Sequence, residues 1–304
     1  DGTVRFSNRA ASELVGADGA PPAAIVPHLR RAVEAGHAEA GAVQIGERVY
    51  ALVAREVPAE QGVLAVASDR TEEKRRELAE REFVSNAAHE LRNPLAGISG
   101  AIEVLQAGAK DDPEALDHFL RRLSEDVERM NRLMQSLLTL ARVEALPEGE
   151  AEVVDVHSAA ADAVAAVQVE EQTQLVTEVE GGLAAHGDPL LLRQVLIGLL
   201  SNAVRHTPPT GAVILRGRHV NGDAMIEVAD TGDGIPAEEV DRVFERFYRS
   251  SDALGHEGFG LGLAIAKRMV QVMGGSIGAA SEEGHGSVFW VRLPAAEPII
   301  TPVA

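Results

Sequence analysis

Two long segments of the sequence carry apolar residues at alternating spacings of four and three, the repeat of a helix with one narrow apolar stripe. The first segment carries Val84, Ala88, Leu91, Leu95, Ile98, Ile102 and Leu105. The second carries Leu116, Leu120, Leu123, Val127, Met130, Met134, Leu137 and Ala141. The intervening loop "GAKDDPEA" places Pro113 where a helix begins. Two antiparallel helices cannot bury such narrow stripes by themselves, so the pattern predicts a hairpin that joins a second copy in a four-helix bundle.

A polar cluster lies beside the first stripe. The stretch "FVSNAAHELRNPLAGI" (83–98) carries His89, Glu90 and Asn93, followed at once by Pro94. Proline inside a helix costs roughly 3 kcal/mol, and here it would free the carbonyl of Glu90. A sequence that specified only a stable helix would not contain it, so the cluster is a candidate for chemistry. His89 falls outside the stripe and is expected to be partly exposed.

The remaining segments are separated by changes of composition. Residues 1–68 contain "GAVQIGERVYALVAREV" and "GVLAVASD", which alternate as half-buried antiparallel strands do, after an opening that reads as a strand and a short helix. Residues 69–82 are charge-dense and predict a helical linker. "EALPEGEAE" ends the hairpin segment, 83–147, and residues 148–294 mix strand and helix patterns, including a short helix at "AEEVDRVFERF". They predict an α/β sandwich, and 295–304 a disordered tail.

Three further motifs lie in the sandwich segment. "DTGDGIP" ends an apolar strand, "EGFGLGLAIAK" opens a helix, and "RQVLIGLLSNAVRHTPP" places Asn202 near the end of another helix. Glycines at such places let the backbone approach a ligand and leave amide groups free for phosphate. A tight turn explains either glycine stretch equally well, and Asn202 alone is explained by the end of a helix. The conjunction of all three in one domain is much more specific.

Composition limits the partners. The net charge of −19 disfavours wide contact with nucleic acid or anionic membranes. The absence of cysteine excludes disulfides and thiolate metal sites. No apolar run approaches the roughly 20 residues of a membrane span. Because the chain lacks an initial Met, we interpret it as a cytoplasmic fragment, with any inner-membrane anchor in sequence outside it.

The motifs together resemble those of sensor histidine kinases of two-component systems, over residues 83–294. "FVSNAAHELRNPLAGI" resembles their H-box, "QVLIGLLSNAVRHTP" the N-box, "DTGDGIP" and "GFGLGLAI" the G-boxes, and "VFERFYR" the F-box. "DGTVRFSNRAASELVG" with "SDRTEEKRR" resembles a PAS sensor module. The resemblance implies a multidomain fold: an α+β PAS-like module, an antiparallel helical hairpin forming a dimeric four-helix bundle, and an α/β sandwich of the Bergerat (GHKL) ATP-binding fold.

The resemblance also implies an activity. A homodimer would autophosphorylate His89 from ATP and pass the phosphoryl group to an aspartate of a response regulator. Glu90 would take or orient the imidazole proton. Asn93 stands where many relatives position a water that hydrolyses the phosphorylated regulator. Pro94 would bend the helix just past the reactive turn.

ATP and Mg²⁺ are the implied cofactors. Asn202 would hold Mg²⁺ across the phosphates, Asp230 would bind the adenine amino group, and the glycines of the second G-box would admit the phosphates. The implied nucleotide-binding residues are Asn202, Arg205, His206, Asp230, Gly232, Gly234, Ile235, Phe247, Gly258, Phe259, Gly260, Leu261, Gly262 and Leu263.

Two departures from the family pattern leave alternatives open. Gly198 replaces an asparagine four residues before Asn202, and Glu257 replaces a glycine. A catalytically degenerate signalling scaffold of the same fold is therefore one alternative. A phosphate-hydrolysing ATPase of the wider superfamily is another, although position 198 lacks the acidic residue that such enzymes use to activate water.

Overall fold

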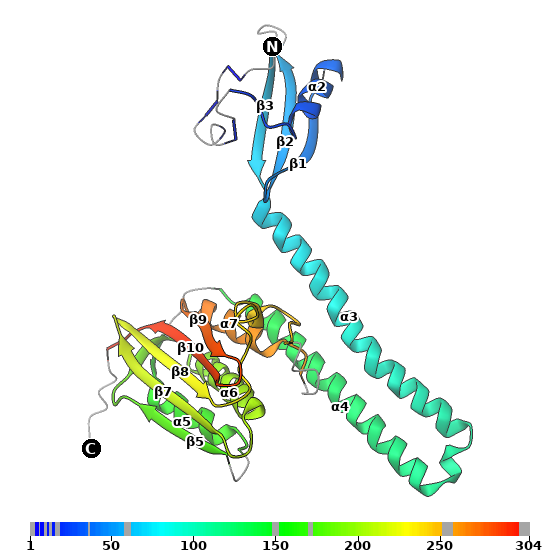
Figure 1. Cartoon of the computed structure of the whole chain (residues 1–304), viewed down its shortest axis with the longest axis vertical. Helices are drawn as coiled ribbons and strands as arrows, with labels where there is room; N and C mark the ends of the chain where they lie inside the picture. Colours follow the sequence, from blue (N-terminus) through cyan, green and yellow to red (C-terminus); the bar gives the residue numbers. More distant parts are fainter. Residues whose placement is uncertain are drawn as a thin grey trace. The chain divides into compact units, whose positions relative to one another are not determined.

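The structure is a computed structural model of the 304-residue chain. It describes residues 4–5, 7–8, 11, 14–15, 19–35, 37–57, 62–147, 152–169, 173–250 and 258–297. The chain forms two compact units, Asp1–Ser85 and Asn86–Ala304. Figure 1 shows the elements of both units.

The first unit contains a three-stranded antiparallel sheet in the order β1 (Glu39–Ile45), β2 (Arg48–Val57), β3 (Gly62–Asp69). Helix α2 (Val26–Ala35) packs on this sheet. Tyr50, Leu52 and Ala54 alternate along β2 and are buried, which confirms the strands expected from the period-two pattern. The strand and helix expected at residues 1–16 lie mostly outside the described residues.

Helix α3 spans Thr71–Gln106, so the expected linker and the first half of the hairpin form one continuous helix. Pro94 lies inside it, and its ring is buried. Helix α4 (Pro113–Glu144) follows a short 3-10 turn, η2 (Ala109–Asp111). The Asp112 side chain accepts hydrogen bonds from the amides of Glu114 and Ala115 at 3.0 and 3.4 Å, a standard N-cap that fixes where α4 begins. The expected helical hairpin is confirmed.

Helix α4 has two apolar faces, of which the heptad pattern revealed one. Leu120, Val127 and Met134 of the stripe are exposed in this chain, at 52%, 48% and 46%. Leu133, Leu140 and Val143 were not part of the stripe, yet they are buried, at 0%, 1% and 4% exposure. The second face arises because α4 packs against α7 of the sandwich, which a repeat within one helix cannot show.

The sandwich contains a five-stranded sheet in the order β5-β7-β8-β10-β9, with helices on one face (Figure 1). The strands are β5 (Gln174–Val179), β7 (Ala212–Val220), β8 (Asp223–Asp230), β9 (Ser276–Glu282) and β10 (Gly286–Pro294). The helices are α5 (Val156–Ala166), α6 (Pro189–His206) and α7 (Gly262–Val272). β5 pairs with β7 in parallel, and the remaining pairs of this sheet are antiparallel.

The core of the sandwich lies between the sheet and α6. Leu192, Leu196 and Leu199 of α6 meet Leu215 of β7 and Ile226 of β8, each at most 1% exposed. Burying one such side chain contributes about 1.5–3 kcal/mol. This packing fixes the face of α6 that remains outside the core and is available to a ligand.

Three expectations need correction. The short helix expected at "AEEVDRVFERF" is a series of turns with one 3-10 turn, η3 (Arg242–Phe244), because Glu239 and Arg242 donate to carbonyls three residues back. β4 (Glu152–Asp155) pairs with β6 (Ala184–Gly187), a strand that was not expected. The start of the tail is ordered against β6, since the Ala296 amide donates to the Ala184 carbonyl at 3.0 Å.

Among the helices of the described segments, none combines the length and the apolarity required to cross a bilayer.

Candidate functional site

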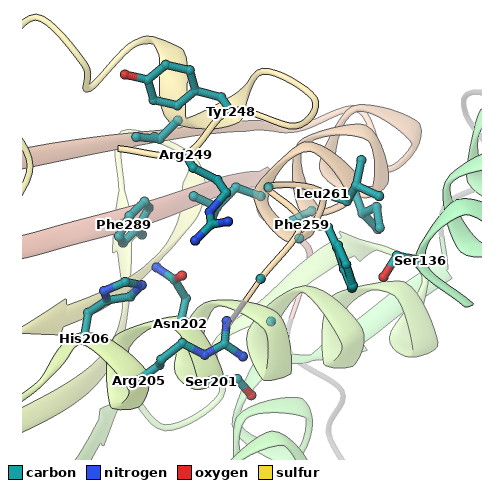
Figure 2. A pocket seen from close by; sticks show the side chains of 18 of the residues that line it. Ser136, Ser201, Asn202, Arg205, His206, Tyr248, Arg249, Phe259, Leu261 and Phe289 are labelled. Atoms are coloured by element: carbon teal, nitrogen blue, oxygen red, sulfur yellow. The ribbon is translucent and has the colours of Figure 1, made fainter. Parts of the chain in front are cut away.

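A cavity of about 610 Å³ lies in the second unit, and Figure 2 shows many of its side chains. Its walls come from α6, from the loop that follows β8, from the segment around Phe259 that leads into α7, and from α4. The structure brings together all the predicted nucleotide-binding residues except Gly232 and Phe247. The three motifs of the sandwich therefore meet at one place, as their conjunction indicated.

Asp230 ends β8 at the back of the cavity and is only 8% exposed. Its Oδ1 accepts hydrogen bonds from the amides of Gly232 at 2.9 Å and Ser287 at 3.2 Å. Burial raises the pKa of the Asp230 carboxyl above its ordinary value, and the two amide donors partly oppose that shift. Within the described residues its Oδ2 has no hydrogen-bond partner, so this oxygen can accept a hydrogen from a ligand.

The loop after β8 is held by backbone contacts that only glycine permits. A Cβ at Gly232 would lie 2.2 Å from the carbonyl oxygen of His206, and one at Gly234, whose φ is +73°, would lie 2.2 Å from that of Glu282. Gly232 thus does not line the cavity but lets the loop pack against the end of α6. The Ile235 amide donates to Ser281 Oγ at 2.7 Å, which fixes the far side of the loop to β9.

Helix α6 presents one polar face to the cavity. Asn202, Arg205 and His206 are spaced three and four residues apart and therefore share a side of the helix. Gly198 lies one turn earlier on the same wall, and a Cβ there would meet no atom within 4 Å. The missing asparagine thus leaves open space beside Asn202.

The segment before α7 is held in place by a backbone hydrogen bond. The Phe247 amide donates to the Gly260 carbonyl at 2.9 Å, and both residues have positive φ, +63° and +67°. A Cβ at Gly260 would lie 2.4 Å from the Tyr248 carbonyl oxygen. Phe247 therefore holds the segment in place instead of lining the cavity, which Tyr248 and Arg249 do. His256 and Glu257 lie outside the described residues.

The residues of the helical cluster do not line this cavity. On α3, His89 and Asn93 are exposed, as expected for His89. The Glu90 side chain is 27% exposed, and Arg129 Nη2 of α4 donates to its Oε2 at 3.4 Å. Glu90 is thus engaged with α4, and within the described residues it makes no hydrogen bond with the neighbouring imidazole.

Sequence reasoning missed the contribution of α4. Five of its side chains line the cavity: Arg129, Arg132, Gln135, Ser136 and Thr139. The Arg129 guanidinium lies 5.4 Å from the centre of the Phe259 ring, and Arg246 forms an ion pair with Glu144 at the end of α4. The spacing of three to four residues marks one polar face of α4, but the sequence does not say which element that face meets.

The donors present fit a magnesium ion that is held mainly by a ligand. The described residues contain no group of three or more His, Asp or Glu side chains that could hold a metal. The Asn202 amide does reach the cavity, and Mg²⁺ in nucleotide sites is bound through few protein groups together with substrate phosphates and waters. Asn202 is therefore the residue that would hold such an ion, together with phosphates and waters.

Two family models match the helical hairpin and the sandwich. The model described as "His Kinase A (phospho-acceptor) domain" matches residues 79–146. The model described as "Histidine kinase-, DNA gyrase B-, and HSP90-like ATPase" matches residues 187–297. Fold and cavity thus define a protein that joins a phospho-acceptor helical domain to an ATP-binding domain of the ATPase type.

Curated relatives agree with this class. WalK of Staphylococcus saprophyticus, a sensor protein kinase, is 34% identical over 263 residues, which cover 81% of this chain and 41% of the relative. TcrY of Mycobacterium tuberculosis, a probable sensor histidine kinase, is 39% identical over 219 residues, which cover 70% of this chain and 46% of the relative. The chain belongs to the sensor histidine kinases of two-component systems, and it spans less than half the length of these two relatives.

Solved structures show the same architecture. Full-length ShkA in complex with AMPPNP is 27% identical, with a TM-score of 0.51 over 71% of this chain and 46% of that chain. Histidine kinase ThkA in complex with response regulator TrrA has a TM-score of 0.58 over 97% of this chain and 93% of that chain. At 21% identity the second match is a likeness of fold alone.

Proposed function

We propose that this chain is an ATP-dependent protein-histidine kinase that phosphorylates His89 and passes the phosphoryl group to an aspartate of a response regulator. The observation that carries the proposal is the pairing, in one chain, of an exposed histidine on a phospho-acceptor hairpin with a cavity that gathers the N-box and both G-boxes. The similar solved kinase bound to AMPPNP supports the choice of ATP.

In this reaction the imidazole of His89 attacks the γ-phosphorus of ATP. A nitrogen–phosphorus bond forms, the bond to the ADP oxygen breaks, and the imidazole proton passes to Glu90 or to water. Phosphoryl transfer depends mostly on positioning and on neutralising phosphate charge. Arg205 supplies such charge from α6, and Mg²⁺ held by Asn202 and the phosphates would supply more. Asp230 Oδ2 would accept a hydrogen from the adenine amino group.

The chain would act as a homodimer through the hairpin, with residues 83–147 as the phosphotransfer domain and 148–294 as the ATP-binding domain. The exposed stripe that contains Val84, Leu95, Val127 and Met134 supports this assembly. Residues 1–68 would form a PAS-like sensor module, supported by the antiparallel sheet with one covering helix, and 69–82 a signalling linker.

Incubation with γ-labelled ATP and Mg²⁺ tests the activity. The expected product is acid-labile label on the protein, lost in His89→Gln, which should still bind ATP because His89 is exposed and outside the cavity. Label on His89→Gln would overturn the acceptor assignment. No label on the unmutated chain would favour a degenerate scaffold, and free phosphate without label an ATPase.

The metal role of Asn202 and the phosphatase role of Asn93 have separate measurements. Asn202→Ala should weaken binding of MgATP much more than of metal-free ATP, and equal losses would rule out a metal ligand.

Asn93→Ala should retain autophosphorylation but slow the decay of phospho-regulator. Unchanged decay, with the unmutated kinase faster than regulator alone, would leave Asn93 as a surface residue.

A further inference from the structure

The helical hairpin contributes a polar wall to the nucleotide cavity, and Arg129 is the first residue of α4 in this wall. Arg129, Arg132, Ser136 and Thr139 follow one another at three- and four-residue spacing along α4. The opposite wall is α6 with Asn202 and Arg205. In Figure 2 Ser136 lies on the side of Phe259, and Asn202 and Arg205 lie on the other side of the cavity.

The cavity is rich in positive groups although the chain is acidic. Its described lining contains the four arginines Arg129, Arg132, Arg205 and Arg249 against the two aspartates Asp230 and Asp233, in a protein of net charge −19. Guanidinium groups bind phosphate through short charge-assisted hydrogen bonds, often two at a time. Half of this positive charge comes from α4, outside the ATP-binding domain.

The Arg129 side chain is 41% exposed, and within the described residues one of its buried donors has no acceptor. Its Nη2 donates to Glu90 Oε2 at 3.4 Å, which is long for a charged pair, and its guanidinium lies 5.4 Å from the centre of the Phe259 ring. Its Nε is buried and has no hydrogen-bond partner in the described part of the chain. A guanidinium has five N–H donors, and a buried donor left unpaired costs about 1–3 kcal/mol. The geometry is that of a donor group whose acceptor is a ligand.

We propose that Arg129 is a polyphosphate-binding residue of the cavity, so that the phospho-acceptor hairpin supplies part of the site for a nucleoside triphosphate. This inference rests on the proposed function and adds a residue to it. Phe259 lies between Gly258 and Gly260, where the phosphates are expected, and it places the guanidinium beside them. The phosphate and Glu90 compete for Arg129. Triphosphate binding therefore releases the Glu90 carboxylate beside His89, which links occupancy of the cavity to the acceptor helix.

Titration calorimetry on the full chain tests the binding role with MgATP and AMP as probes. Arg129→Gln should weaken MgATP about tenfold, as loss of one charge-assisted hydrogen bond implies, and leave AMP unchanged. Arg129→Lys should recover part of the loss, because it keeps the charge. The matched control is Arg122→Gln, on the same helix but outside the cavity, which should bind both probes as the unmutated chain does.

The competition with Glu90 gives a second, independent readout. Glu90→Gln should tighten MgATP about twofold to threefold in the unmutated background and have no effect in the Arg129→Gln background. Equal effects in both backgrounds would overturn the competition.

Unchanged MgATP binding by Arg129→Gln, or an equal loss for MgATP and AMP, would overturn the phosphate-binding role and leave the proposed function intact. An unmutated chain that binds no MgATP would overturn both.

Discussion

Asp230 combines a structural and a ligand-binding role in one carboxylate. Its Oδ1 ties the loop after β8 to the start of β10 through the Gly232 and Ser287 amides, while Oδ2 makes no protein hydrogen bond among the described residues. A carboxylate buried to 8% exposure is costly unless its oxygens are bonded. Oδ2 of Asp230 therefore lacks a hydrogen bond that a donor group of a ligand would supply.

Replacement by asparagine should separate these roles. Asp230→Asn keeps an oxygen for the two amides but places a donor where the adenine donor would bind, so ATP affinity should fall at least about tenfold.

Burial raises the pKa of Asp230, so the folded state binds the proton more tightly than the unfolded state. That stabilisation is complete below the ordinary carboxyl pKa and is lost as pH rises through the raised one.

Because asparagine does not ionise, the stability of Asp230→Asn relative to the unmutated chain should increase with pH across that window. Urea unfolding between pH 4 and pH 7 measures this. A relative stability of Asp230→Asn that is independent of pH would contradict the assigned cause of the shift.

At the scale of elements, the conformation of the segment before α7 depends on a backbone hydrogen bond more than on side chains. The Phe247 and Gly260 backbones pair, and the left-handed conformation of both lets the chain reverse within a few residues. The three glycines of this motif are therefore not equivalent. Gly260 satisfies a conformational requirement, whereas Gly262 begins a helix in open space.

Two alanine substitutions should show the difference. Gly260→Ala forces an L-residue into positive φ and against the Tyr248 carbonyl, so the unfolding free energy should fall by about 1–3 kcal/mol and ATP binding should weaken. Gly262→Ala meets no atom within 4 Å, so stability should change by less than about 1 kcal/mol. Denaturant unfolding and ATP titration of both variants provide the comparison. Equal losses of stability would show that the backbone contact between Phe247 and Gly260 is unimportant.

At the scale of the whole molecule, α4 has two apolar faces in different environments. One face, with Leu133 and Leu140, is buried within the chain, and the other, with Val127 and Met134, is left exposed. Exposed apolar side chains in a regular stripe are typical of a helix that packs on another copy. The hairpin is thus suited to contact both the ATP-binding domain and a second chain.

A charge placed in the stripe should disrupt the dimer. Val127→Glu would bury a carboxylate in an apolar seam, which costs several kcal/mol, so the dimer dissociation constant should rise by at least about 100-fold. Light scattering across a concentration series measures the mass. His118→Glu adds the same charge to an exposed position of the same helix outside the stripe and should leave a dimer. A monomeric unmutated chain at high concentration would contradict the four-helix bundle.

Local patterns predicted most of the elements because each has a short-range physical cause. The alternation in β2, the heptad spacing of α4 and the Pro113 start are properties of neighbouring residues, and all three were confirmed. The expected helix at 237–247 was wrong because helical composition there does not outweigh the turns after Pro236. β6 was missed because the four residues Ala-Ala-His-Gly, between longer segments, carry no periodic signal.

By itself the sequence determined the segments, the hairpin and the motif residues that line the cavity, because spacing along the chain encodes helix faces and turns. Only the tertiary structure decided which of those residues face the cavity and which hold it together. Gly232 and Phe247 lie outside the lining and support the backbone beside it, whereas Arg129 and Ser136 line the cavity from a helix about seventy residues before Asn202 in the sequence. The reason is that contacts between distant elements depend on how their surfaces pack, and no local repeat records which surface a polar face will meet.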